Sequence, residues 1–496
     1  MNYKFAHRNP INFVDFYKVG HINQYPKGTS QVWSNWTPRN SRVPGTAKIV
    51  NFGLTYFIKA YLDEQFSTYF FGRPIWEVLN EYRDIIKATL GVQEPRTDHI
   101  EALHRLGYLP LKIYALPEGA MVPLNVPTFI ITNTRPEFFW LPNYLETMLS
   151  NCLWKTSTSA TTARRYREVC LKHARRSGET DFGFIDWQCH DFSYRGMSGT
   201  EDAKLSGMGH LLYFSGTDTV PAILAAHAYY NAPLSCGGSV PATEHSVMCA
   251  GEEDGEFETF KRLLTEVYPS GIVSVVSDTW DLWRVLTDYI PRLKDTILAR
   301  EGKLVIRPDS GDPIEILCGS GSSNSAYPSS RGTVRLLAEA LGTTPQNSGL
   351  PLINKAGAIY GDSITVARAD EILQRTVDEL KLSPYNVVFG VGSFTYQMVT
   401  RDTYGWAMKA TAVRRDGKIV PIFKKPVTDD GGKFSHKGLL AAYVCTDAEL
   451  NLTYMLRQGV TEEQLENCAY RKVYENGDLL HAPDFATIRQ LARMGL

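Results

Sequence analysis

Short apolar runs in the middle of the sequence end in glycine together with a polar or acidic residue. Residues 304–306 continue into Arg307, Pro308 and Asp309, and four further runs end similarly, at 211–214, 272–276, 358–360 and 387–389. A β-branched apolar run is typical of a buried strand, and proline ends a strand because it cannot donate to the sheet ladder. In a parallel β/α barrel the carboxyl ends of the strands share one rim. We therefore expect the residues that follow these runs to form one site.

Aspartates and arginines at one rim suit a phosphorylated sugar. Carboxylates can bind ribose hydroxyls or Mg²⁺, and guanidinium groups bind phosphate oxygens in a bidentate fork. Glycines at strand ends usually only turn the chain, yet they also let backbone N–H groups approach a phosphate. The charged residues of this kind are Arg195, Asp218, Arg307, Asp309 and Asp362, and the glycines include Gly361 and Gly392. This set favours a transferase or isomerase that acts on phosphorylated sugars.

Two histidine-containing stretches admit both a structural and a functional interpretation. Residues 190–196 follow a strand-like run at 182–187 and could stack a flat ring on Phe192 and hold its anionic group on Arg195. A structural His-Asp pair among core aromatic residues explains the same stretch. In residues 239–246, His245 follows a glutamate. That pair suits a proton relay or a metal, although a lone histidine is more often structural and no second ligand stands at a fixed spacing.

Other conspicuous stretches have an ordinary structural explanation. Residues 15–26, which include Tyr17, predict an N-terminal helix with buried aromatic residues. The glycine- and serine-rich residues 318–332 predict a flexible surface loop without a phosphate-binding role, because no Walker pattern occurs there. A solvated basic face would account for four cations of a β-rich region near the carboxyl end of the chain, Arg401, Lys409, Lys424 and Lys433.

The composition argues against several classes of protein. A chain of 496 residues is too long for one ordinary core, so two domains are expected. The formal net charge of -1 gives no field that favours nucleic acid or an anionic membrane, and we expect neither as a partner. No signal peptide is evident, and no stretch of about 18 apolar residues could span a bilayer. Eight cysteines without a C-x-x-C pair indicate reduced thiols and a cytoplasmic protein.

The periodicity of apolar residues divides the chain into two domains. Strands alternate with helices over 181–397, which predicts an α/β domain with a mainly parallel sheet. Before and after it, β-forming residues and the D-G and N-G hairpin signals predict antiparallel strands. We expect 181–397 to form a β/α-barrel domain, and 1–180 together with 398–496 to form a mixed α+β domain. The helices expected from their periods lie at 51–62, 75–90, 143–175, 256–267, 333–341, 372–380 and 486–494.

Seven motifs resemble, in order, those of the nicotinamide phosphoribosyltransferase family. They are D-x-Y-K-V-x-H-x-x-Q-Y-P from Asp15, H-D-F-S-Y-R-G from His190, G-T-D-T from Gly216, S-V-P-A-x-E-H-S from Ser239, S-V-V-S-D from Ser274, I-R-P-D-S-G from Ile306 and T-R-D from Thr400. The match covers nearly the whole chain, and S-V-P-A-x-E-H-S is highly specific. The family belongs to the type II phosphoribosyltransferases, whose β/α-barrel domains form homodimers with shared active sites.

The resemblance implies transfer of phosphoribose from phosphoribosyl pyrophosphate to the ring nitrogen of nicotinamide. The products would be nicotinamide mononucleotide and pyrophosphate, and Mg²⁺ would be required. Phe192 and the partner subunit's Tyr17 would sandwich the nicotinamide ring, with Ser274 near the carboxamide. Asp218 would accept a hydrogen bond from the carboxamide NH₂ and repel the carboxylate of nicotinate.

The resemblance also implies contacts for the phosphoribosyl group. Arg195, His245 and Arg307 would contact pyrophosphate. Asp309 and Asp362 would hold the ribose and, with Mg²⁺, stabilise an oxocarbenium-like transition state. Mg²⁺ would be held mainly by pyrophosphate, with Asp309 as the candidate protein ligand. The residues implied around the 5′-phosphate are Gly361, Gly392 and Ser393, with Arg401 of the partner subunit.

ATP is the remaining cosubstrate that the resemblance implies. His245 matches the histidine that this family phosphorylates with ATP to drive the reaction forward. The basic residues that match the ATP and phosphate path are Lys409, Lys424 and Lys433. Two departures, Phe16 in place of a small polar residue and Ser393 in a run that is usually glycine, concern substrate affinity more than reaction type. The alternatives are nicotinate phosphoribosyltransferase, against which Asp218 argues, and a non-catalytic dimeric signalling or binding protein.

Overall fold

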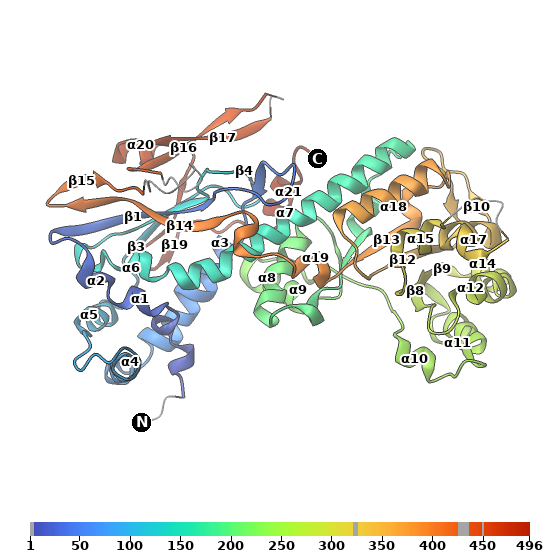
Figure 1. Cartoon of the computed structure of the whole chain (residues 1–496), viewed down its shortest axis with the longest axis horizontal. Coiled ribbons are helices and arrows are strands. Elements are labelled where there is room, and N and C mark those ends of the chain that lie inside the picture. The colour runs from blue at the N-terminus through green and yellow to red at the C-terminus, as the bar shows by residue number, and fades with distance from the viewer. Residues whose placement is uncertain (1–3, 321–325, 425–435, 449–450) are drawn as a thin grey trace. The chain divides into compact units, whose positions relative to one another are not determined.

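A computed structural model describes residues 4–320, 326–424, 436–448 and 451–496 (Figure 1). The chain divides into two compact units. The antiparallel unit contains Met1–Thr158, Ala225–Ala232 and Thr400–Gly495, and the parallel unit contains Ser159–Leu224 and Pro233–Val399. The sequence-based division, 181–397 against the two ends, stays a prediction. The compact units differ from it mainly because the first boundary falls inside one long helix.

The parallel unit is built on a six-stranded, wholly parallel sheet. Its strands, in spatial order, are β7 (Gly216–Thr217), β6 (Cys189–Asp191), β13 (Val387–Val391), β12 (Ala356–Tyr360), β9 (Glu301–Arg307) and β8 (Ser270–Val276). The first strand of the sequence therefore pairs with the last. β7 and β8 are the two edge strands of this sheet. The predicted β/α-barrel-like sheet is confirmed.

Residues 238–242 lie in the gap between β7 and β8. Gly238 forms a parallel bridge to Gly216, and Ala242 forms one to Ser274. The N–H of Thr217 donates to the carbonyl of Gly238 at 2.9 Å, and the N–H of Ser274 donates to the carbonyl of Pro241, also at 2.9 Å. The S-V-P-A-x-E-H-S motif thus begins inside a short segment that completes the barrel ring.

Four of the five apolar runs are strands, and they are β8, β9, β12 and β13. The run at 211–214 is not a strand, because it is the end of α8 (Thr200–Leu211) and the turn after it; the strand β7 follows. The strand-like run at 182–187 is a 3₁₀ helix, Gly183–Trp187, which precedes β6. Residues 211–214 are fully buried, and a short buried helix end has the same apolar pattern as a strand.

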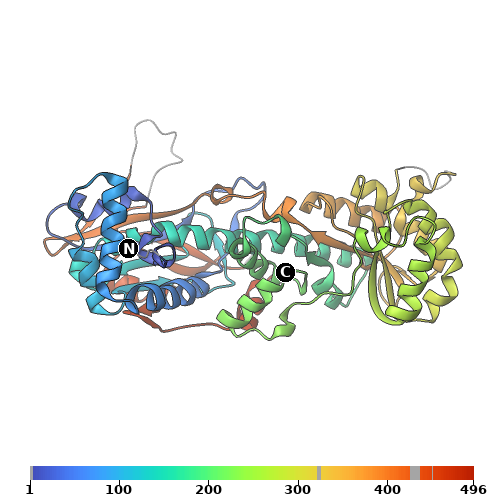
Figure 2. The ribbon, with the colours of Figure 1, turned by 90° about the horizontal axis from the view of Figure 1, so that it is seen from below.

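Helices cover the outer face of the parallel sheet (Figures 1 and 2). α15 (Pro313–Cys318) and α17 (Thr333–Leu341) pack on β12, and α18 (Val366–Asp378) lies nearby. The predicted apolar face of α17 is buried, as expected from its period. The predicted helix at 256–267 is α11 (Glu256–Arg262) followed by one π-helical turn, Leu263–Val267. Of the glycine- and serine-rich segment, residues 321–325 lie outside the described residues.

The antiparallel unit contains a seven-stranded sheet from both ends of the chain. Its order is β15 (Lys418–Pro421), β14 (Trp406–Arg415), β1 (Thr29–Pro38), β5 (Phe129–Asn133), β3 (Leu111–Ala115), β18 (Arg471–Glu475) and β19 (Asp478–Leu479). Both hairpin signals are confirmed. Asp416 and Gly417 both have positive φ, as a tight turn between twisted antiparallel strands requires, and Asn476 and Gly477 do the same.

Several helices accompany this sheet. α4 (Ile75–Leu90) has the predicted bounds, and α7 (Glu146–Ser177) and α21 (Phe485–Arg493) are close to theirs. The helix expected at 51–62 is α3 (Leu54–Phe57), which continues as π-helical turns over Ile58–Gln65. The expectation of buried aromatic residues at the start of the chain is wrong, because Phe16 and Tyr17 are 47% and 62% exposed. In the described part of the chain, no helix is long and apolar enough to span a membrane.

Candidate active site

Aspartates follow the carboxyl ends of three neighbouring strands, β8, β9 and β12. Asp278 accepts hydrogen bonds from the backbone N–H of Asp309 at 2.8 Å and from the hydroxyl of Ser310 at 2.6 Å. Burial, together with the charges of Asp362 and Asp309, raises the pKa of Tyr360 well above its ordinary value. These carboxylates therefore form an acidic rim. Within the described ranges, no three His, Cys, Asp or Glu side chains converge as a metal site.

Phe192 lies directly on the backbone of β12 and β13. A Cβ atom at Gly390 would be 2.2 Å from Cδ2 of the Phe192 ring, and one at Gly361 would be 3.1 Å from the same atom. The ring can occupy this place only because residue 390 is glycine, and a side chain at residue 361 would also crowd it. The Arg307 guanidinium lies 5.3 Å from the ring centroid, and one of its nitrogens is 3.9 Å from Asp309 Oδ1. The structure thus brings together the predicted aromatic platform, a predicted pyrophosphate contact and a predicted ribose contact.

Asp218 follows β7, which is the edge strand next to β6. Its Oδ1 accepts a hydrogen bond from Ser239 Oγ at 2.5 Å, and its backbone N–H donates to the carbonyl of Asp191. Beside it, burial lowers the pKa of His190 to about 4, and the charge of Asp218 only partly opposes this. The His190 imidazole is therefore neutral at pH 7. Its ring lies where a Cβ atom at Gly216 would be only 2.6 Å away.

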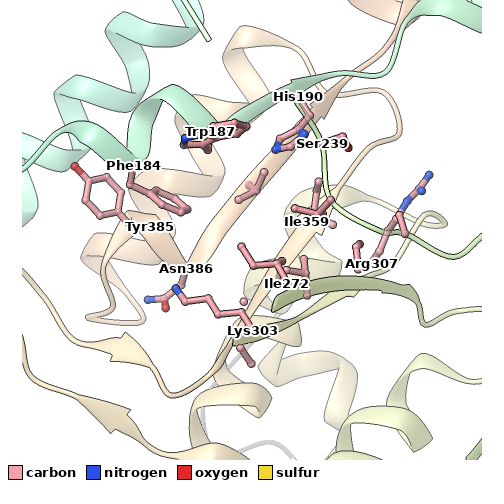
Figure 3. A pocket seen from close by; sticks show the side chains of 18 of the residues that line it. Phe184, Trp187, His190, Ser239, Ile272, Lys303, Arg307, Ile359, Tyr385 and Asn386 are labelled. Carbon is pink, nitrogen blue, oxygen red and sulfur yellow. The ribbon is translucent and has the colours of Figure 1, made fainter. Parts of the chain in front are cut away.

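A cavity of about 360 Å³ extends from this group of residues into the barrel (Figure 3). Four predicted site residues line it, and they are Phe192, Asp218, Ser274 and Arg307. Side chains of a strand alternate between its two faces, so Lys303, Val305 and Arg307 of β9 all point into the cavity. Ser274 is 4% exposed, and its hydroxyl has no hydrogen-bond partner among the described residues. That hydroxyl is available to a ligand.

His245 begins the short helix α10 (His245–Cys249). Its side chain is 48% exposed, its Nε2 is 4.0 Å from Asp278 Oδ1, and its Nδ1 is 3.2 Å from the hydroxyl of Thr279. Asp278 is almost fully buried, and its Oδ1 has no hydrogen-bond partner in the described part of the chain. A proton on His245 Nε2 would therefore face a carboxylate that is already tied to Asp309.

The turn that carries Arg195 lies against the start of α19 (Ser393–Tyr396). A Cβ atom at Gly196 would be 2.1 Å from Ser393 Oγ, so this turn can approach the Gly392–Ser393 loop only with glycine at that position. Arg195 itself belongs to a 3₁₀ turn, Tyr194–Gly196. The predicted contacts of pyrophosphate and 5′-phosphate are therefore neighbours in the fold.

The remaining predicted residues belong to the antiparallel unit, and their part in the site stays a prediction. Tyr17 is exposed and packs edge-on against His21, with ring centroids 5.3 Å apart. Arg401 and Lys409 are exposed. Lys433 lies outside the described residues.

Sequence reasoning did not single out three residues of the site, Asp278, Ser239 and His190. Each had a signal. Asp278 follows a predicted strand, as Asp309 does, and Ser239 and His190 each open one of the quoted motifs. Their partners could not be read from the chain, because Ser239 is 21 residues from Asp218 and Asp278 is 31 residues from Asp309.

Comparisons with known proteins agree with this architecture. Residues 187–478 match the nicotinate phosphoribosyltransferase (NAPRTase) family, and residues 10–94 match the N-terminal domain of nicotinamide phosphoribosyltransferase. A nicotinamide phosphoribosyltransferase of Acinetobacter baylyi is 47% identical over 97% of this chain and 96% of its own. That of Mycoplasma pneumoniae is 34% identical over 88% of this chain and 98% of its own. The crystal structure of human nicotinic acid phosphoribosyltransferase is 17% identical with a TM-score of 0.59, over 97% of this chain and 93% of that one, and supports the fold alone.

Proposed function

Because the chain belongs to the nicotinamide phosphoribosyltransferase family, we propose that it transfers the 5-phosphoribosyl group from phosphoribosyl pyrophosphate to nicotinamide in NAD salvage. The bond from ribose C1 to pyrophosphate breaks, and a bond from C1 to the pyridine nitrogen forms. The products are nicotinamide mononucleotide and pyrophosphate. The observation that carries this choice is the carboxylate of Asp218 at the cavity that Phe192 and Ser274 also line.

These three residues give the site a preference for the amide. The nicotinamide ring stacks on Phe192, for whose ring Gly361 and Gly390 leave room. Asp218 accepts from the carboxamide NH₂, and the Ser274 hydroxyl, which has no hydrogen-bond partner among the described residues, bonds to the same group. The carboxylate of nicotinate has no proton to donate and carries the same charge as Asp218. Nicotinate therefore loses a hydrogen bond and gains a repulsion.

The phosphoribosyl group lies over the acidic rim. Arg307 and Arg195 bind the pyrophosphate, and Asp309 and Asp362 bind the ribose hydroxyls and stabilise positive charge that develops at C1. The rim fits Mg²⁺, since Asp278 keeps one buried oxygen without a hydrogen-bond partner among the described residues and oxygen ligands are what Mg²⁺ prefers. Asp309 would hold the ion together with pyrophosphate oxygens. When bound, Mg²⁺ would neutralise charge on the leaving pyrophosphate.

ATP coupling is the part of the proposal that rests on His245. This half-exposed imidazole can be reached by a nucleotide, and with the proton on Nε2 its Nδ1 would attack the γ-phosphorus of ATP and release ADP. Asp278, 4.0 Å away, would orient the ring and take up its proton. Lys409, Lys424 and Lys433 would attract the triphosphate. In a homodimer, the partner subunit's Tyr17 and Arg401 would complete the nicotinamide and phosphate sites.

Mass-spectrometric detection of products tests this function. The purified chain would receive phosphoribosyl pyrophosphate and Mg²⁺ with nicotinamide or with nicotinate, each with and without ATP. We expect nicotinamide mononucleotide from nicotinamide, at a rate that ATP raises. Mononucleotide formed from nicotinate but not from nicotinamide would instead favour nicotinate phosphoribosyltransferase. If neither pyridine gave a mononucleotide, a non-catalytic binding protein would be favoured. A rate that ATP leaves unchanged would refute only the coupling step.

A further inference from the structure

His210 lies between two segments that carry predicted site residues. It belongs to the last turn of α8 and is fully buried. Its Nε2 lies 2.9 Å from the carbonyl oxygen of Gly216, and its Nδ1 lies 2.7 Å from the hydroxyl oxygen of Tyr396. Gly216 is two residues before Asp218, and Tyr396 is three residues after Ser393. One imidazole therefore joins the strand before a predicted nicotinamide contact to the helix that begins at a predicted phosphate contact.

The roles of the two ring nitrogens follow from these partners. A carbonyl can only accept a hydrogen bond, so Nε2 of His210 donates to Gly216. In the neutral ring Nδ1 is then an acceptor, and it receives the hydroxyl proton of Tyr396. Burial raises the pKa of Tyr396 well above its ordinary value, so the phenol keeps that proton. One ring nitrogen thus donates and the other accepts, and different side chains can replace the two bonds separately.

The strand that precedes Asp218 is short. β7 contains two residues and lies at the edge of the sheet. The N–H of Thr217 donates to the carbonyl of Gly238. The N–H of Asp218 donates to the carbonyl of Asp191. These bonds hold N–H groups, whereas the bond from His210 holds a carbonyl of the same segment. It therefore limits rotation of the backbone that leads to the Asp218 carboxylate.

Tyr396 holds the other segment. It ends α19, a helix of four residues, and its own N–H donates to the carbonyl of Gly392 at 3.1 Å. Its ring is almost fully buried and packs edge-on against His210, with ring centroids 5.8 Å apart. Because Tyr396 is bonded to Gly392 by its backbone and to His210 by its side chain, it fixes the loop that Gly392 and Ser393 form.

We propose that His210 is a positioning residue for both substrates: Nε2 holds the strand that presents Asp218 to nicotinamide, and Nδ1, through Tyr396, holds the Gly392–Ser393 loop that binds the 5′-phosphate. The inference rests on the proposed function, because that function assigns these two segments to nicotinamide and to phosphoribosyl pyrophosphate. His210 does not belong to the cavity lining, so it acts only through the segments that it holds.

Calorimetric titration of the full chain with each substrate alone, in the presence of Mg²⁺, separates the two bonds. The amide of asparagine lies near the position of Nδ1, and that of glutamine near the position of Nε2. His210→Asn should keep the bond to Tyr396 and lose the bond to Gly216. Loss of one hydrogen bond predicts a Kd for nicotinamide raised about fivefold, with the Kd for phosphoribosyl pyrophosphate unchanged. His210→Gln should do the reverse, and Tyr396→Phe, which keeps the buried ring, should behave as His210→Gln does.

His173→Asn is the matched control. His173 is also a fully buried histidine of the parallel unit, and its Nε2 lies 2.6 Å from Asp370 Oδ1. The replacement removes a buried imidazole that is bonded to neither segment. Both dissociation constants should therefore equal those of the unmodified chain.

Three results would overturn the inference. They are an unchanged Kd for phosphoribosyl pyrophosphate in Tyr396→Phe, an equal rise of both constants in His210→Asn and His210→Gln, and the same rise in His173→Asn. The last two would indicate a loss of core packing only. If the His210 variants do not fold, the result for Tyr396→Phe decides.

Failure of the proposed function gives a different result. An unmodified chain that binds both substrates but forms no mononucleotide would refute that function and leave the positioning role open to the same titrations. Mononucleotide formation with unchanged constants in the three variants would refute only the positioning role. An unmodified chain that binds neither substrate would refute both.

Discussion

Replacement of Asp218 by serine tests the account of amide selectivity directly. Two unit charges about 4 Å apart repel by roughly 1 kcal/mol in water and roughly 4 kcal/mol near a protein surface. Asp218 is exposed, so we expect a value toward the lower end, equivalent to about tenfold in kcat/KM for nicotinate. Loss of the charged hydrogen bond should lower kcat/KM for nicotinamide by about tenfold or more. The ratio of the two should therefore change by roughly a hundredfold.

The assay is competition between the two pyridines, with both mononucleotides quantified by mass spectrometry. Ser239→Ala is the matched control. It removes the hydrogen bond to Asp218 but keeps the carboxylate, so most of the discrimination should remain. If Asp218→Ser discriminates against nicotinate as strongly as the unmodified chain, the selectivity does not come from this carboxylate and the reasoning is wrong.

Three further predictions follow from particular contacts. Gly390→Ala should displace the Phe192 ring and raise KM for nicotinamide at least about tenfold, because its Cβ atom would lie 2.2 Å from the ring; Gly199→Ala, with no atom within 4 Å, should not. His245→Gln should prevent transfer of labelled γ-phosphate from ATP to the protein, and label retained by this variant would exclude His245 as the acceptor. Burial lowers the pKa of His99 to about 4, below its unfolded value, so its contribution to stability is present above pH 6.5 and is lost as the pH falls toward 4; His99→Phe should lose about 2 kcal/mol less stability than the unmodified chain between pH 7 and pH 5 in urea unfolding, and equal losses would contradict this.

The sequence predicted much of the fold because local patterns were unambiguous there. The four strands β8, β9, β12 and β13 combine β-branched runs with glycine or proline ends, and the turns at 416–417 and 476–477 have residues that tolerate positive φ. The prediction of a strand at 211–214 was wrong because a buried helix end is as apolar as a strand. Composition alone could not distinguish them.

The sequence predicted which residues belong to the candidate site better than it predicted which of them contact one another. Phe192, Asp218, Ser274 and Arg307 line one cavity as their motifs suggested. The bond between Ser239 and Asp218 could not be predicted, because it depends on residues 238–242 completing the barrel ring. The sequence did not predict that Lys303 lines the cavity, because Lys303 precedes the fully buried Leu304 and alternation along a strand would place the lysine on a solvent-facing side.

The pairing of β1 with β14 has a consequence for synthesis in the cell. One edge of β1 is paired with β5, which follows within about 100 residues, but its other edge pairs with a strand made about 370 residues later. At roughly 5–20 residues per second, that edge stays open for tens of seconds. Phe192 also lacks its backbone partner until late in synthesis, because its N–H donates to the carbonyl of Val391. A nascent chain therefore carries an unpaired strand edge and no pyridine site until most of it has left the ribosome, and such an edge is prone to pair with another chain.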